Sequence, residues 1–262
     1  MPTFIDQTGN TLTFNKRPER VISIVPSQSE FLYAIGLQNN LIGITKFCIH
    51  PDKMFKSVER IGGTKNLNIE KIRALKPDLI IANKEENERW QIEILQKEFN
   101  VWISDIYNFE DAFVMMSELG KITKKKEAAQ KIITEIKKTL PAIKNIFNKE
   151  TAIYFIWNKP YMIAAQNTFI DHVLNYIGIL NSAHNLHRYP ELTNEALIKI
   201  EPQFCFLSSE PFPFKEKHVK EMQKLLPNTK IKIVDGEMFS WYGSRLTKLP
   251  SYIKQLHKEL LR

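Results

Sequence analysis

Short apolar runs alternate with amphipathic segments along the first part of the chain. The runs at residues 20–25, 41–44, 78–82 and 101–104 are almost wholly apolar, which is typical of strands buried on both faces of a sheet. Between them, the pattern predicts helices at 69–75 and 88–99. A further helix, capped by Ser27 or Ser29, is predicted to run to Ile35, with Gly36 as its stop. A hairpin is predicted at 4–14. Alternating strands and helices at this spacing predict an α/β fold with a parallel sheet.

The second half of the chain repeats this scheme. The segment "LNIEKIRALKPDLIIA" (67–82) aligns with "LTNEALIKIEPQFCFL" (192–207) at a constant offset, so that Glu70 matches Glu195 and Pro77 matches Pro202. "FLYAIGLQN" (31–39) aligns with "VLNYIGILN" (173–181), and "WISD" (102–105) more weakly with "KIVD" (232–235). The same order of matches predicts two similar lobes, each with a parallel-type sheet flanked by helices. Chance likeness between α/β units is the alternative.

A helical pattern without glycine or serine connects the two halves. Apolar residues keep helical spacing from Thr123 to Phe147, and Pro141 is expected to kink or break the helix. At ~1.5 Å per residue, such a helix would be over ~30 Å long and would permit little hinge motion. We therefore predict an N-terminal lobe at residues 1–122, one long backbone helix at 123–148, and a C-terminal lobe at 149–262.

Composition narrows the class of protein. Hydrophobic residues make up 43% and charged residues 25%, as in ordinary globular proteins, and no run approaches the ~20 apolar residues of a membrane span. The net charge of +8 favours anionic partners, but the lysines are dispersed, without a nucleic-acid recognition motif, so no nucleic acid is expected. Cys48 and Cys205 are expected to be free thiols. The start at Met1–Pro2 shows no leader pattern, which leaves two locations open: cytoplasmic, or periplasmic or lipid-anchored after removal of a leader.

Polar and aromatic residues gather where predicted strands end, which is where parallel α/β sheets bind ligands. The turn 83–87 and the segment "FSWYGSR" (239–245) are the most conspicuous, and Ser208–Ser209–Glu210 is a further strand end. Each has a second interpretation: a solvated turn before a helix for 83–87, and a packed aromatic loop for 239–245. The candidate ligand-binding residues are Ser27, Gln28, Phe47, Cys48, His50, Lys84, Glu85, Glu86, Trp157, Tyr161, Phe239, Trp241, Tyr242 and Arg245.

Other chemistries find weaker support. The chain has no Gly-x-Ser-x-Gly elbow, no phosphate-binding loop and no Gly-x-Gly-x-x-Gly, so no catalytic residues are assigned and the protein is expected not to be an enzyme. Cys48 and His50 are weak candidates for metal ligands, with Glu85 or Glu86 completing a site. They could instead contact a metal-containing ligand or simply pack. His184 and His187 lack an obvious third ligand.

Several motifs resemble one known family. "RVISIVPSQSEFLYAIGL", "IGITKFCIHP" and "IGGTKNLNIEKIRALKPDLIIAN", with the long helix, are similar to ABC-transporter substrate-binding proteins with a helical backbone, the group of cobalamin, siderophore and haem receptors. The resemblance implies two lobes that grip a ligand in the cleft between them and deliver it to a permease. Glu70 and Glu195 resemble the two glutamates that dock the cobalamin receptor on its permease. As an alternative, both are helix N-terminal acids favoured by the dipole.

The resemblance also suggests a ligand class. Phe47, Trp157, Phe239 and Arg245 match ligand-contact positions of the cobalamin receptor, whereas Thr64 and Asn83 replace tryptophans. We expect a large metal chelate, either a cobalamin-type corrinoid, a haem or a ferric siderophore, bound by a monomer without an intrinsic cofactor. Aromatic side chains would form the walls of the site, and Arg245 and Lys84 would meet acidic groups of the ligand. The alternative is an intracellular corrinoid- or metal-binding sensor of the same fold.

Overall fold

The computed structural model describes residues 2–261, so Met1 and Arg262, the outer limits of the two predicted lobes, lie outside the described residues. The chain forms two compact units. The first contains residues 2–106, residues 110–136 and the short segment 242–245. The second contains residues 107–109, 137–241 and 246–261. The boundary between the units thus falls inside a helix, and a segment of the C-terminal half packs with the N-terminal half.

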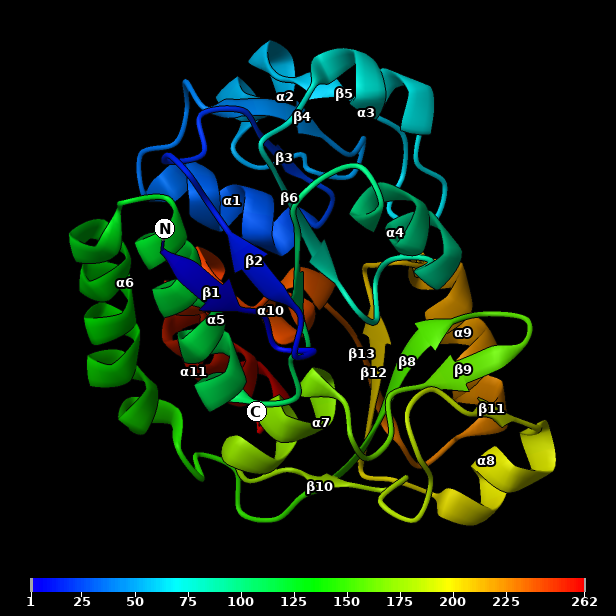
Figure 1. The fold of residues 1–262 in the computed structure, drawn as a ribbon. Coiled ribbons are helices and arrows are strands. Elements are labelled where there is room, and N and C mark those ends of the chain that lie inside the picture. Colours follow the sequence, from blue (N-terminus) through cyan, green and yellow to red (C-terminus); the bar gives the residue numbers. More distant parts are fainter. Residues whose placement is uncertain (1, 262) are drawn as a thin grey trace. The chain divides into compact units, whose positions relative to one another are not determined.

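The first unit is built on a parallel sheet with the strand order β5-β4-β3-β6-β7. Figure 1 labels β5, β4, β3 and β6. The strands are β3 (Val21–Ser23), β4 (Leu41–Ile44), β5 (Glu59–Arg60), β6 (Leu79–Asn83) and β7 (Val101–Ser104). The helices are α1 (Pro26–Ala34), α2 (Asp52–Ser57), α3 (Ile69–Leu75), α4 (Arg89–Gln96) and α5 (Phe109–Ile122). β1 (Thr3–Ile5) and β2 (Thr11–Thr13) form an antiparallel hairpin. The predictions of a hairpin and of a parallel sheet are therefore confirmed.

Helix α1 begins differently from the sequence prediction. Val25 is its N-cap residue and provides no side-chain hydrogen bond, because the helix already starts at Pro26. Proline favours this first position, where its missing N–H has no intrahelical partner to lose. The prediction of Ser27 or Ser29 as the cap is wrong, since both lie inside the helix. The predicted stop is confirmed: Gly36 has φ +91°, a left-handed conformation that side chains disfavour.

The second unit contains a mixed sheet with the order β11-β9-β8-β12-β13, and β10 also pairs with β8. Its strands are β8 (Thr151–Trp157), β9 (Tyr161–Ile163), β10 (Leu180–Asn181), β11 (Glu191–Leu192), β12 (Phe204–Ser208) and β13 (Lys230–Val234). Its helices are α7 (Phe169–Tyr176), α8 (Asn194–Ile200), α9 (Glu216–Leu225), α10 (Gly236–Ser240) and α11 (Leu249–Leu260). The strands β8, β10, β12 and β13 pair in parallel, whereas β9 is antiparallel to both of its neighbours.

The internal repeat extends to the backbone. Helix α3 is capped by the side chain of Asn68 and helix α8 by that of Thr193, and each cap accepts a bond from the backbone N–H three residues on. Both helices end at a residue in the left-handed conformation, Lys76 (φ 45°) and Glu201 (φ 39°). The strand that follows each is paired on both sides and lies next to an edge strand, β6 in one unit and β12 in the other. The repeated sequence thus encodes a repeated capped helix and buried strand.

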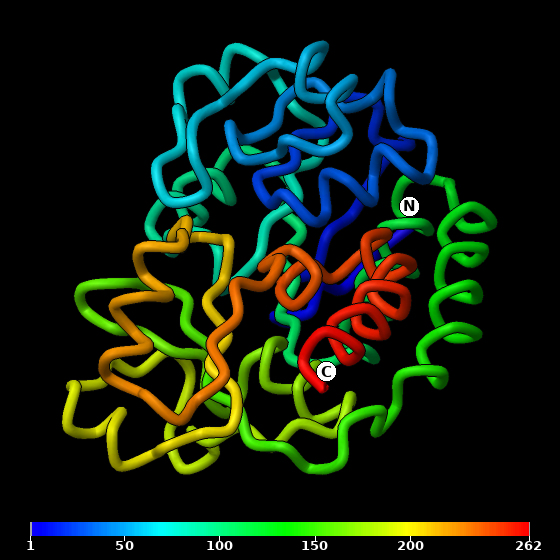
Figure 2. The backbone as a smooth tube through the Cα atoms, turned by 180° about the vertical axis from the view of Figure 1, so that it is seen from behind, coloured from blue at the N-terminus to red at the C-terminus, as the bar shows by residue number. Residues whose placement is uncertain are grey.

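The connecting helix is shorter than the sequence predicts. Helix α6 covers Lys126–Thr139, and a 3-10 turn, η1 (Leu140–Ile143), follows it. Figure 2 shows α6 as one regular helix that gives way to an irregular tube. Pro141 has no backbone N–H to donate into the preceding turn, so the α-helix cannot continue through it. Lys124 has φ 53°, which separates α6 from α5 on the other side.

Candidate functional site

Polar side chains form a connected network at the carboxyl ends of β6 and β7 in the first unit. Asn83 Nδ2 donates to the Ser104 hydroxyl at 3.0 Å, and Gln28 Nε2 donates to the same hydroxyl at 2.5 Å. Asn83 Oδ1 accepts from the backbone N–H groups of Glu85 and Glu86, at 2.8 and 3.0 Å. This Asx-type turn explains why the buried strand β6 passes directly into a polar segment. Asn83 and Ser104 were not candidates, although Asn83 ends an otherwise apolar run.

Two candidate residues at the start of α1 are buried. The hydroxyl of Ser27 and Oε1 of Gln28 have no hydrogen-bond partner in the structure, which is uncommon for buried polar atoms. The amide nitrogen of Gln28 donates to Ser104, whereas its amide oxygen accepts no hydrogen bond. The carboxyl end of β3 therefore carries hydrogen-bonding capacity that the protein itself does not use.

The three charged candidates after β6 differ in their partners. Lys84 is exposed and forms an ion pair with Asp105, Nζ to Oδ2 at 2.6 Å. The Glu86 carboxylate accepts a hydrogen bond from the Tyr242 hydroxyl at 2.8 Å, which joins two candidates that are far apart in the sequence. Glu85 is half-buried, and its backbone carbonyl accepts from Lys65 Nζ at 2.9 Å. Residues 84–86 thus form an acidic segment with one lysine at its edge, which we call the rim.

The loop after β4 presents Phe47 and hides Cys48. Phe47 is 49% exposed, and the Lys46 ammonium lies 5.1 Å from its ring centroid. Cys48 is buried, with hydrogen bonds at 3.2 Å to the hydroxyls of Ser29 and Thr45. Burial raises the pKa of the Cys48 thiol to about 11, so the thiolate that metals bind is disfavoured at neutral pH.

Support for a metal centre is weak elsewhere as well. His50 is half-buried. Among residues 2–261, no group of three or more His, Cys, Asp and Glu side chains is arranged to hold a metal ion. Cys205 is free and buried like Cys48, which confirms the prediction of two free thiols. We do not include Cys48 and His50 as metal ligands in the function proposed below.

Arg245 is held by a partner that the sequence did not reveal. Its guanidinium donates through Nε and Nη2 to the two carboxylate oxygens of Glu30, at 3.0 and 2.9 Å. Both side chains are nearly buried, and the pair fastens the segment 242–245 to helix α1. Gly243 permits close approach, since an added Cβ would lie 3.1 Å from the backbone oxygen of Ser27. Arg245 therefore has an intramolecular anion in place of the predicted ligand carboxylate.

The aromatic candidates of the second unit divide into exposed and buried ones. Trp157, at the end of β8, is 41% exposed and contacts Phe212 edge-on with 5.6 Å between ring centroids. Tyr161 is half-buried against Phe155. Phe239 is fully buried, with ring centroids 5.2 Å from Tyr154. Trp157 and Tyr161 thus offer surface to a ligand, whereas Phe239 is packed in the core.

Trp241 is fixed by Glu210, which follows β12. The indole Nε1 donates to the Glu210 carboxylate at 2.8 Å, and the Ser240 hydroxyl donates to the same oxygen at 2.9 Å. Trp241 and Tyr242 are both nearly buried. Of the two interpretations of "FSWYGSR", a packed aromatic loop therefore describes it better than an open aromatic wall. The sequence placed Glu210 at the end of a predicted strand, but it gave no sign that Trp241 is its partner.

Ionisation of Glu210 should lower the stability of the protein as the pH rises toward neutrality. Burial, and then the neighbouring acids, raise its pKa from 4.5 to about 7. The folded state therefore retains a proton that the unfolded state has lost between these values, so this contribution is complete below 4.5 and is lost as the pH rises to about 7. The unfolding free energy of Glu210→Gln minus that of the wild type should therefore increase by roughly 2–3 kcal/mol as the pH rises from 4.5 to 8. Urea denaturation at each pH measures this difference. A constant difference across this range would contradict the assignment.

The two glutamates of the repeat occupy equivalent, exposed positions. Glu70 is the second residue of α3 and Glu195 the second residue of α8. Arg73 contacts Glu70 at 2.5 Å, whereas Glu195 bonds locally, and these local hydrogen bonds lower its pKa. Both carboxylates are accessible at the surface, as a docking role requires.

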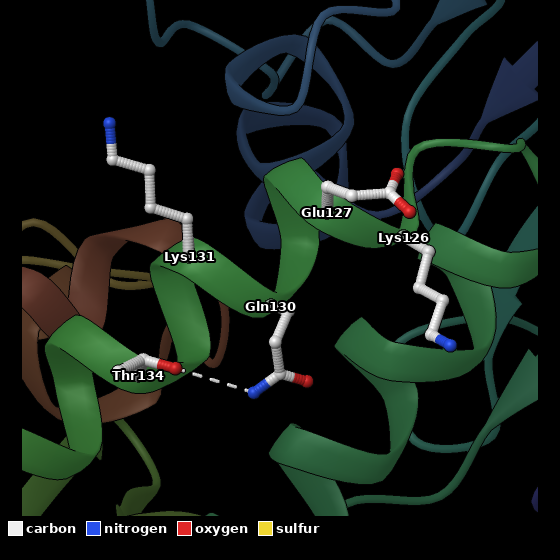
Figure 3. A pocket seen from close by; sticks show the side chains of 5 residues that line it. All are labelled: Lys126, Glu127, Gln130, Lys131 and Thr134. Atoms are coloured by element: carbon white, nitrogen blue, oxygen red, sulfur yellow. Dashed lines mark hydrogen bonds between the residues drawn. The ribbon is translucent and has the colours of Figure 1, made fainter.

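One surface hollow lies far from these strand ends in the sequence. It has a volume of about 440 Å³ and is lined by Lys126, Glu127, Gln130, Lys131 and Thr134. Figure 3 shows all five side chains projecting from helix α6 alone. Because a single helix has no facing wall and these residues include no aromatic ring, we do not place the ligand there.

Comparison with known proteins decides the family. The family model described as "Periplasmic binding protein" matches residues 21–229, which is most of the chain. The chain belongs to the periplasmic binding protein family. Periplasmic binding proteins capture ligands for transport and are not enzymes, so the prediction of a non-enzymatic binding protein is confirmed.

Relatives and solved structures agree with this family. The chain is 30% identical over 206 residues to the vitamin B12-binding protein of Vibrio parahaemolyticus, covering 76% of this chain and 74% of the relative. It is 29% identical over 213 residues to an uncharacterized ABC transporter substrate-binding lipoprotein, YvrC, of Bacillus subtilis, covering 77% and 67%.

The haem-binding protein RhuT of Roseiflexus sp. has the same fold, with a TM-score of 0.80 at 16% identity, over 92% of this chain and 99% of the other. The predicted two-lobe fold with a helical backbone is thereby confirmed. The lipoprotein and periplasmic relatives support a location outside the cytoplasm. None of the helices within residues 2–261 has the length and hydrophobicity of a membrane span.

Proposed function

We propose that this protein captures a large metal chelate outside the cytoplasm and delivers it to the permease of an ABC importer. The ligand class is a cobalamin-type corrinoid, a haem or a ferric siderophore. The observation that carries the proposal is the 30% identity, across three quarters of the chain, to a protein named for binding vitamin B12. Solved structures of the same fold are named for binding haem or for possible iron binding.

The proposed ligand contacts are residues at strand ends. Phe47 and Trp157 are the exposed aromatic surfaces, and a flat conjugated ligand gains burial and stacking from such rings. Lys84, Glu85 and Glu86 provide a charged rim, while Ser27 and Gln28 retain unused hydrogen-bonding atoms. A ligand with a large apolar framework and peripheral polar groups fits this combination.

The ligand can be identified with the purified protein. Native mass spectrometry and absorption spectra after incubation with cyanocobalamin, haemin or a ferric siderophore should show one stoichiometric complex per chain. We expect Trp157→Ala to weaken that complex by about tenfold, since removing an aromatic contact costs roughly 1–2 kcal/mol. If no member of the panel binds to the wild type, the proposed ligand class is wrong.

We also propose that Glu70 and Glu195 dock the protein on its permease. In a strain that lacks the gene for this protein and is complemented with Glu70→Ala/Glu195→Ala, uptake of the identified ligand should fall at least ~10-fold, because both anionic contacts are lost. Ligand affinity should be unchanged. The matched control is Glu127→Ala/Glu216→Ala, which removes two other first-turn glutamates. Equal uptake by the two double variants would refute the docking role.

A further inference from the structure

Glu210 anchors the start of the segment that joins α10 to the first unit. Its Oε1 atom accepts from both the Trp241 indole, at 2.8 Å, and the Ser240 hydroxyl, at 2.9 Å. The fit is close, because a Cβ at Gly236 would lie 2.7 Å from Glu210 Cγ. Trp241 is followed directly by Tyr242, whose hydroxyl donates to Glu86 on the rim after β6. One carboxyl group thus fixes a tryptophan next to a rim contact.

The groups that face Glu210 are polar or acidic. The charges of Glu237 and Asp235, at the start of α10, raise the pKa of Glu210. The charge of Glu210 in turn helps to raise the pKa of the Tyr154 hydroxyl on β8. Ser208, at the end of β12, accepts a hydrogen bond from Tyr154 at 3.1 Å and a longer one from the Glu210 backbone. Burial and the two acids favour the neutral form, whereas the bonds from Ser240 and Trp241 favour the ionised form, and the pKa is raised to about 7.

We propose that Glu210 is a positioning residue for ligand binding: its carboxylate fixes the indole of Trp241, and protonation of that carboxylate loosens the indole and weakens the hold on the ligand. This inference rests on the proposed function, in which Glu86 belongs to the charged rim that contacts the ligand: Tyr242, the residue after Trp241, donates to that carboxylate. It extends that function by making ligand retention sensitive to pH near neutrality.

The physical reason lies in the charge of the Glu210 acceptor oxygen. A hydrogen bond to an ionised acceptor is about twice as strong as one to a neutral acceptor, so protonation weakens both bonds to Oε1. Ser240 has a second acceptor, the Gly236 carbonyl at 2.9 Å, to which its hydroxyl can donate fully. The indole has a single N–H, which donates to Glu210, so protonation of Glu210 weakens the hydrogen bond of that N–H.

Tryptophan fluorescence tests, in the absence of ligand, whether Glu210 fixes the indole of Trp241. For the wild type, emission should change with a midpoint near pH 7, and the change should vanish in Glu210→Gln and in Trp241→Phe. Glu210→Gln keeps an amide oxygen for the indole and is expected to fold. Glu216→Gln, an equal substitution of an exposed glutamate on α9, should titrate like the wild type. A titration that persists in Glu210→Gln would overturn the proposal.

Ligand affinity tests the consequence for function. Whichever of cyanocobalamin, haemin or ferric siderophore binds, its affinity for the wild type should be about fivefold weaker at pH 6 than at pH 8, as expected when charge-assisted bonds lose about half their strength. Glu210→Gln should change less than about twofold over the same range. Parallel changes in the two proteins would overturn the proposal. If no probe binds at either pH, the proposed function fails, and fluorescence alone decides whether Glu210 holds Trp241.

Discussion

Substituting Arg245 with methionine is expected to lower the free energy of unfolding by ~3–5 kcal/mol. Arg245 is 6% exposed, and its guanidinium binds both oxygens of Glu30. Methionine fills much of the same volume but leaves the Glu30 carboxylate buried without its cation, which costs far more than the net contribution of the pair. Chemical denaturation in urea, followed by circular dichroism, measures the effect.

The double variant Glu30→Met/Arg245→Met separates the pair from its packing. Because replacing both members of a buried pair by apolar side chains is often close to neutral, the double variant should recover to within ~1–2 kcal/mol of the wild type. Lys84→Met is the matched control for an exposed pair, and losing its contact with Asp105 should cost less than ~1 kcal/mol. If Arg245→Met were as mild as Lys84→Met, the buried pair would not be what fastens the segment 242–245.

Replacing Phe239 with alanine is expected to destabilise the protein by ~3–5 kcal/mol. Phe239 has no exposed surface, and its ring lies among Tyr154, Phe206 and Tyr252, with ring centroids 5.2 to 6.2 Å away. Removing the ring leaves a cavity that the surrounding aromatic side chains cannot fill by small movements. Urea denaturation of the variant measures this loss.

Phe47→Ala is the matched control, since it removes the same ring from a surface position. Phe47 is 49% exposed, so its replacement should change stability by less than ~0.5 kcal/mol and should instead weaken ligand binding. The two phenylalanines, which the sequence assigned the same role, should therefore separate into a core residue and a ligand contact. A Phe239→Ala variant of wild-type stability with impaired ligand binding would reverse that distinction.

Local pattern was sufficient to predict most of the secondary structure. The predicted bounds 41–44, 69–75 and 101–104 coincide with β4, α3 and β7. These segments are either continuous apolar runs or short helices with a capping residue and a proline shortly after the end, and both signals act over a few residues. The repeat was equally visible, because each copy must bury the same face of the same helix and strand. The connecting helix was overestimated, since helical spacing of apolar residues continued past Pro141 where the backbone could not.

The sequence by itself determined the α/β alternation, the repeat, and the end of each sheet at which polar residues gather, because periodicity and chain direction encode these features locally. The tertiary structure alone decided which candidates are available to a ligand. Glu30 and Arg245 are 215 positions apart, Glu86 and Tyr242 are 156 apart, and Glu210 and Trp241 are 31 apart. A buried charge or N–H finds its partner through packing in three dimensions, and no local spacing records that choice.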